Sequence, residues 1–189
     1  PVWWYLPVVF SDSFPWSFFL FPAAALWFRE RRQTVAAIDG ANRIRTLLWL
    51  WILAIVGFFS LSAGKQDLYI YPIAPAIVAL AAVVITGAAA SQSADARTKL
   101  VTAVVGGVLI VAGAGFLILF NSELAVYVLA GSLFVGAIAI AGGSAAIVLA
   151  LRQRIGAALI TVACALIAGN WIFVLKLLPS FEAYKPAPG

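Results

Sequence analysis

The sequence has 189 residues, of which 65% are hydrophobic and only 10% are charged, with a formal net charge of +5. Soluble domains are about 45–50% apolar and about 25% charged, so this composition excludes an ordinary soluble fold and indicates lipid as the solvent. The positive charge is therefore no sign of nucleic-acid binding. Because the chain has no histidine and a single cysteine, Cys164, no ordinary zinc site is expected, and no cofactor is evident.

The first 28 residues contain three prolines and a polar stretch at their centre. We expect residues 1–12 to form an outer interfacial segment rich in Trp and Tyr. A short membrane-spanning helix over about 13–28 would follow, with Asp12 or Ser13 as its cap and a proline in its first turn. A single kinked helix over residues 2–28 is the competing interpretation.

Five longer apolar stretches follow, and each has about the length that a membrane-spanning helix needs. They cover residues 46–63, 69–90, 100–120, 124–151 and 155–178. Together with the first helix they predict an all-α fold, a polytopic transmembrane helix bundle of about six spans over residues 13–178. We expect residues 179–189 to form an outer tail that leads to a missing C-terminal part, and the true N-terminus to be missing as well.

The basic residues predict the orientation of this bundle. Nine of the twelve Lys and Arg residues lie in three alternate connections, namely Arg29, Arg31, Arg32, Arg43, Arg45, Arg97, Lys99, Arg152 and Arg154. The positive-inside rule assigns these connections to the cytoplasm. The connection that contains Lys65 is then extracytoplasmic.

The later spans are rich in glycine and alanine. Ser132 with Gly136, and Ala139 with Gly143, form small-xxx-small pairs that favour close approach of helix backbones. A pore lined by small residues is the alternative, but these spans carry no ionisable side chain inside the membrane. We therefore expect close helix packing.

A polar break separates the second and third predicted spans. Gly64 is well placed to end one helix, and Pro72 lies where the first turn of the next is expected. Lys65 would then lie in a tight outer hairpin at headgroup depth. It either extends to the interface above an aromatic belt that includes Tyr69, or pairs with a phosphate, for which a compact ammonium is suited.

The stretch from Ser62 to Pro75 resembles the outer-loop signature of aminoarabinose-transferase-like and protein-mannosyltransferase-like membrane glycosyltransferases, of the GT-C type. The family pattern Ser-x-x-Lys-Leu-Pro-x-Tyr-x-x-Pro-x-x-Pro is matched in register by Ser62, Lys65, Tyr69, Pro72 and Pro75. Gln66-Asp67 replaces its Leu-Pro. The segments WYLPV, at residues 4–8, and LPSFEAYKP, at residues 178–186, also resemble the family.

The resemblance implies a GT-C-like C-terminal half of an enzyme in the bacterial inner membrane. Such enzymes move a sugar from a polyprenyl-phosphate donor to a lipid, glycan or protein acceptor at the extracytoplasmic face. It implies that Lys65 and Tyr69 contact the donor phosphate or its lipid. The general-base carboxylate is expected upstream of this chain, so no catalytic residue is assigned here and the fragment should be inactive alone.

Two other classes of function stay open. A transporter subunit would require paired broken helices or charges near the middle of the membrane. A non-catalytic membrane-anchoring module would lack an upstream outer loop with a carboxylate.

Overall fold

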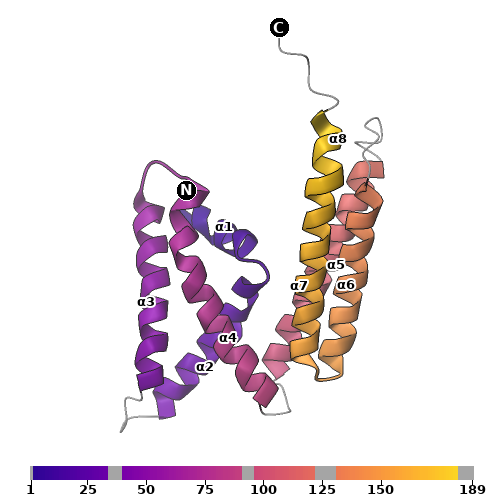
Figure 1. The fold of residues 1–189 in the computed structure, drawn as a ribbon. Coiled ribbons are helices and arrows are strands. Elements are labelled where there is room, and N and C mark those ends of the chain that lie inside the picture. Colours follow the sequence, from indigo (N-terminus) through magenta and orange to yellow (C-terminus); the bar gives the residue numbers. More distant parts are fainter. Residues whose placement is uncertain (1, 34–39, 91–95, 122–130, 183–189) are drawn as a thin grey trace. The chain divides into compact units, whose positions relative to one another are not determined.

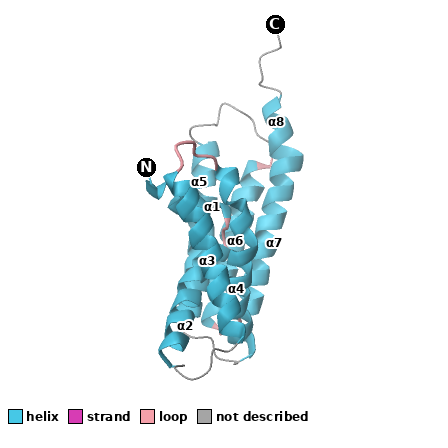
Figure 2. Cartoon of the chain, turned by 90° about the vertical axis from the view of Figure 1, so that its left-hand side faces the viewer, coloured by secondary structure: helices cyan, strands magenta, loops and turns pink. Residues whose placement is uncertain are grey.

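The computed structural model describes residues 2–33, 40–90, 96–121 and 131–182. These residues form helices and short turns, with no strand among them (Figures 1 and 2). Five helices are long and apolar enough to cross a membrane, or six if a bent pair near the N-terminus counts as one span. The predicted all-α class with about six apolar spans is therefore confirmed, while the GT-C-like arrangement stays a prediction.

The apolar stretches of the sequence form the long helices because a backbone in lipid must satisfy its own hydrogen bonds. In chain order these helices are α3 (Gly40–Leu61), α4 (Ala74–Ala90), α5 (Ala96–Asn121), α6 (Ser132–Leu151) and α7 (Ile155–Ile172). A π-helical turn, η4 (Phe173–Leu177), and α8 (Leu178–Glu182) continue α7. The first part of the expected span 124–151 lies outside the described residues, as does most of the tail at 179–189.

The N-terminal segment is broken rather than continuous. A 3-10 turn, η1 (Val2–Trp4), leads into α1 (Tyr5–Asp12), and η2 (Trp16–Phe19) leads into α2 (Leu20–Gln33), with a bend of 110° between the two parts. Neither of the two expected side-chain caps forms, because Asp12 ends α1 and Pro15 occupies the N-cap position without a side-chain hydrogen bond. The placement of residues 1–12 at the outer surface and of 13–28 as a span stays a prediction.

A buried serine stabilises this bend. The hydroxyl of Ser17 donates a hydrogen bond of 2.9 Å to the carbonyl of Phe10, and its backbone N–H donates one of 3.0 Å to the carbonyl of Ser13. The Ser17 side chain is fully buried, so its polar groups need such partners. The polar stretch of the sequence thus satisfies the backbone where the helix is interrupted.

The chain divides into two compact units, Pro1–Val101 and Thr102–Gly189. In the first unit α4 packs against α2, α3 and η2. Its core lies along one face of α4, where Ile77, Leu80 and Ala81 are almost fully buried. By contrast, Ile52 is the only buried residue of α3, so this helix presents apolar side chains around most of its circumference, as lipid-exposed helices do.

In the second unit, glycines bring α5 and α6 into close contact. A Cβ atom added to Gly106 would lie 2.7 Å from the carbonyl oxygen of Gly143, and one added to Gly113 would lie 2.8 Å from that of Gly136. The two pairs are seven residues apart along both helices, so the contacts lie on a single face of each helix. The predicted close packing through Gly136, Ala139 and Gly143 is confirmed.

Candidate functional site

The candidate site is the hairpin that joins α3 to α4. Residue 61 is the last residue of α3, Gln66 is extended (φ −135°, ψ 136°), and a 3-10 helix, η3 (Asp67–Ile73), precedes α4. The sequence predicted that Gly64 ends this helix. That prediction is wrong, because α3 stops three residues earlier. Pro72 lies inside η3 and Pro75 in the first turn of α4, so both prolines are at the start of the returning span.

The ammonium group of Lys65 caps the C-terminal end of α3. It donates hydrogen bonds to three backbone carbonyls, those of Phe59 (3.3 Å), Ser60 (2.7 Å) and Ser62 (2.9 Å). The last carbonyls of a helix have no partner within it and form the negative end of its dipole. Lys65 thus supplies the hydrogen bonds and the positive charge that this helix end requires.

An aromatic side chain lies on the other side of Lys65. The Nζ atom is 5.6 Å from the centroid of the Tyr5 ring, within the range of a cation–π contact. The same tyrosine is fully buried, and its hydroxyl donates to the carbonyl of Gln66 (3.1 Å) and accepts from its N–H (3.2 Å). Tyr5 is a site residue that sequence reasoning missed, although it lies in the WYLPV segment that carries part of the resemblance.

Tyr69 packs on the last turn of the same helix. Its ring stacks on that of Phe59 at 4.8 Å between centroids and 23° between planes. Tyr69 is 36% exposed, and no described residue bonds to its hydroxyl. Since the carbonyl of Phe59 also accepts from Lys65, the structure brings both predicted site residues to one turn of α3.

This arrangement fixes a cation at the end of an apolar helix pair. The ammonium is held by backbone atoms rather than by a carboxylate, so its charge is only partly offset by dipoles. Asp67, the carboxylate nearest in sequence, is exposed in the first turn of η3 and forms no ion pair among the described residues. The site can therefore attract an anion at the depth where the span ends.

The fold and this site define a polytopic helical membrane protein with a cationic, aromatic hairpin at one end of its spans. Similar curated proteins are bacterial enzymes named undecaprenyl phosphate-alpha-4-amino-4-deoxy-L-arabinose arabinosyl transferase. Over 72 residues the chain is 38% identical to one from Pseudomonas fluorescens, 36% identical to one from Wigglesworthia glossinidia brevipalpis and 39% identical to one from Pseudomonas aeruginosa. The resemblance inferred from the sequence is thereby confirmed for this stretch.

The matched stretch is 38% of this chain but only 11% or 12% of each relative, so the chain corresponds to a small part of them. No family model matches the sequence. No solved structure matches it either.

Proposed function

We propose that this chain is part of an integral-membrane glycosyltransferase. Its donor is a sugar linked to a polyprenyl phosphate, and its acceptor is a lipid, glycan or protein at the extracytoplasmic face. The observation that carries the proposal is the match to relatives whose names specify an undecaprenyl phosphate-linked sugar. The hairpin supports it, because a fixed cation at the end of apolar helices suits a phosphate whose tail remains in lipid.

Lys65 contributes to this reaction by binding the donor phosphate. The phosphate gains negative charge as the glycosidic bond breaks, so a cation already in place stabilises the transition state more than the ground state. The three carbonyl contacts hold the ammonium in position before the donor arrives. The carbonyl of Ser62, beyond the end of α3, is the contact that a phosphate oxygen replaces.

Tyr69 contributes a hydroxyl donor to the same phosphate. Its ring is fixed on Phe59, whereas its hydroxyl bonds to no described residue. In this arrangement the carrier lipid lies along the exposed apolar surface of α3. The general base is assigned to a part of the enzyme upstream of this chain, as the family resemblance implies.

The test uses the full-length protein with a labelled polyprenyl-phosphate sugar. Lys65→Ala should lower turnover by roughly 100-fold, the range seen when one preorganised donor to a developing anion is removed. Tyr69→Phe should raise the KM for donor, while Tyr71→Phe, which alters an exposed tyrosine two residues away, serves as its control. If correctly folded Lys65→Ala transferred sugar at the wild-type rate, Lys65 would be a helix cap alone.

The same assay separates the proposed enzyme from its rivals. Transfer by the wild-type protein from the labelled donor supports a glycosyltransferase. A correctly folded full-length protein that transfers no sugar from any polyprenyl-phosphate donor would support an anchoring module or a transporter subunit instead.

A further inference from the structure

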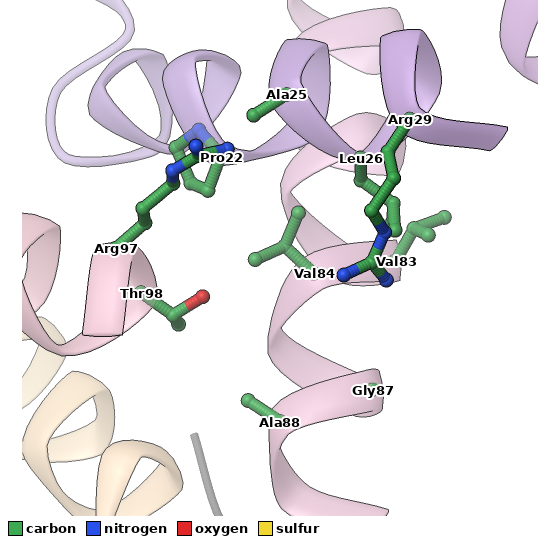
Figure 3. Close-up of a pocket in the computed structure, with 10 residues that line it drawn as sticks. All are labelled: Pro22, Ala25, Leu26, Arg29, Val83, Val84, Gly87, Ala88, Arg97 and Thr98. Carbon is green, nitrogen blue, oxygen red and sulfur yellow. The ribbon is translucent and has the colours of Figure 1, made fainter. Parts of the chain in front are cut away.

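A cavity of about 270 Å³ opens in the first unit, at the other end of α4 from the hairpin. Its walls come from α2, from the last turns of α4 and from the first turn of α5 (Figure 3). The residues that line it include Pro22, Arg29, Val84, Gly87, Arg97 and Thr98. All of them belong to the first unit, and none belongs to the candidate glycosyltransferase site.

Two arginines line this cavity. Figure 3 shows Arg29 extending from α2 and Arg97 from the first turn of α5, with Val84 in the wall of α4. None of the described residues that line the cavity carries a carboxylate. Neither guanidinium forms an ion pair with any residue in the described part of the chain.

Two other arginines at this end have partners among the described residues. Arg45 of α3 forms a two-pronged ion pair with Glu30 of α2, at 2.9 and 3.0 Å. Arg31 lies over the ring of Trp27, 4.5 Å from its centroid. Arg29 and Arg97, like the exposed Arg32 and Arg43, have no ion-pair partner in the described part of the chain, but only these two line the cavity.

Part of the remaining wall is apolar and buried, whereas both arginines and Gly87 are exposed at the open side of the cavity. Pro22 and Val84 are buried, and Thr98 is only 3% exposed. An anion beside such a wall is partly shielded from water, so its attraction to a guanidinium is stronger than at an open surface. A Cβ atom added to Gly87 would meet no atom within 4 Å, so α4 leaves free space at this point.

We propose that this cavity binds a phosphate group through Arg29 and Arg97. Guanidinium groups bind phosphate with paired, planar hydrogen bonds, and two of them supply the charge that a phosphomonoester or phosphodiester requires. The volume is slightly below that of pockets for drug-sized ligands, about 300–1,000 Å³, and suits a phosphorylated headgroup. The ligand is a phospholipid headgroup or a free phosphate compound, and the site does not depend on the proposed glycosyltransferase function.

The binding test uses the full-length protein with two kinds of probe. Nanodiscs with increasing phosphatidylglycerol in phosphatidylcholine present a phospholipid headgroup, and glycerol phosphate added to protein in detergent presents a free phosphate compound. The midpoint of thermal unfolding is followed as a function of either probe, because a ligand that binds the folded state raises it in a saturable way. Stabilisation by the lipid alone assigns the headgroup, and stabilisation by glycerol phosphate in detergent assigns a free compound.

Matched variants show whether the two arginines are responsible. Arg29→Gln/Arg97→Gln should weaken saturable binding by at least roughly tenfold, since two charge-assisted contacts are lost. Arg32→Gln/Arg43→Gln removes the same charge at the same end from exposed residues outside the cavity, and should change binding less than about twofold. An equal loss in both double variants would overturn the proposal, because it would show diffuse surface attraction.

A third variant tests the cavity without changing either arginine, in case Arg29→Gln/Arg97→Gln does not fold. Gly87→Leu keeps both arginines and fills the open side of the cavity, so it should also weaken binding while α4 remains helical by circular dichroism. Unchanged binding in Gly87→Leu, or the lack of stabilisation by either probe in the wild type, would contradict the proposal. In each of these cavity variants, sugar transfer should still depend on Lys65. The phosphate-site proposal and the glycosyltransferase proposal can therefore be contradicted independently of each other.

Discussion

The hydroxyl of Tyr5 lies between the backbone N–H and the backbone carbonyl of Gln66, 3.2 Å from the nitrogen and 3.1 Å from the oxygen. One side chain of α1 thus satisfies both backbone groups of a residue that belongs to no helix. The contact joins segments 61 residues apart, and the ring of the same tyrosine faces the ammonium of Lys65. The position of the hairpin cation therefore depends on α1 as well as on α3.

Tyr5→Phe should destabilise the hairpin, because the backbone N–H of Gln66 loses its partner and its carbonyl keeps only the N–H of Tyr69. Unsatisfied groups of this kind cost about 1–3 kcal/mol, which lowers the midpoint of thermal unfolding by several degrees in a chain of this size. Hydrogen exchange should rise at residues 66–68. Tyr71→Phe is the control, since Tyr71 is 55% exposed. Equal exchange in the two variants would show that the Tyr5 hydroxyl contributes nothing.

Lys65→Ala should loosen the end of α3 independently of any effect on catalysis. Three carbonyls lose a charged donor, and hydrogen bonds to charged groups contribute about 1.5–3 kcal/mol. Amide exchange should increase over residues 58–62, and Lys65→Arg should restore part of the protection because it keeps the charge. Lys176→Ala removes an exposed lysine elsewhere and should leave this exchange unchanged.

The place of this hairpin was predictable from the sequence, but its internal contacts were not. An apolar chain that carries a lysine, an aspartate and two prolines within a few residues must turn there. Gly64 suggested a glycine-terminated helix, whereas α3 ends at residue 61 with Lys65 as its cap. Local pattern does not show that a lysine four residues beyond a helix can reach back to it, nor that Tyr5 supports the intervening backbone.

The number and type of helices were likewise predictable, because the length of an apolar stretch determines whether it can cross a membrane. Small residues on one face of α6 predicted a helix contact. They did not identify Gly106 and Gly113 of α5 as the partners, since pairing depends on tertiary structure. The cavity with Arg29 and Arg97 was also missed, because the positive-inside rule explains the presence of arginines but not the direction of their side chains.

Gly106→Ala should destabilise the second unit. The added methyl group would contact the carbonyl of Gly143 and the side chain of Ile147, at 2.7 and 2.8 Å, so the helices must separate. Such overpacking costs typically about 1–3 kcal/mol. The adjacent Gly107 faces open space, so Gly107→Ala should leave stability unchanged or slightly raise it. Thermal unfolding in detergent of both variants measures the difference, and equal midpoints would contradict the observed packing.

The ion pair between Glu30 and Arg45 should hold α2 against α3 at the arginine-rich end. Its side chains are only 28% and 15% exposed, and both guanidinium contacts are short. The burial of this ion pair is intermediate. Exposed ion pairs contribute less than about 1 kcal/mol to stability, whereas disrupting a buried pair costs about 3–5 kcal/mol. We expect Glu30→Gln to cost about 1–2 kcal/mol, because Arg45 is left without its carboxylate.

A double-mutant cycle with Arg45→Gln separates the pair from its surroundings. The double variant should be destabilised by less than the sum of the single variants, because the second substitution removes the charge that the first leaves unpaired. Arg43→Gln, which changes an exposed arginine on the same helix, should combine additively with Glu30→Gln. Additivity in both cycles would show that the two side chains are not energetically coupled, and that α2 is held to α3 by other contacts, such as the hydrogen bond from Trp27 to Thr46.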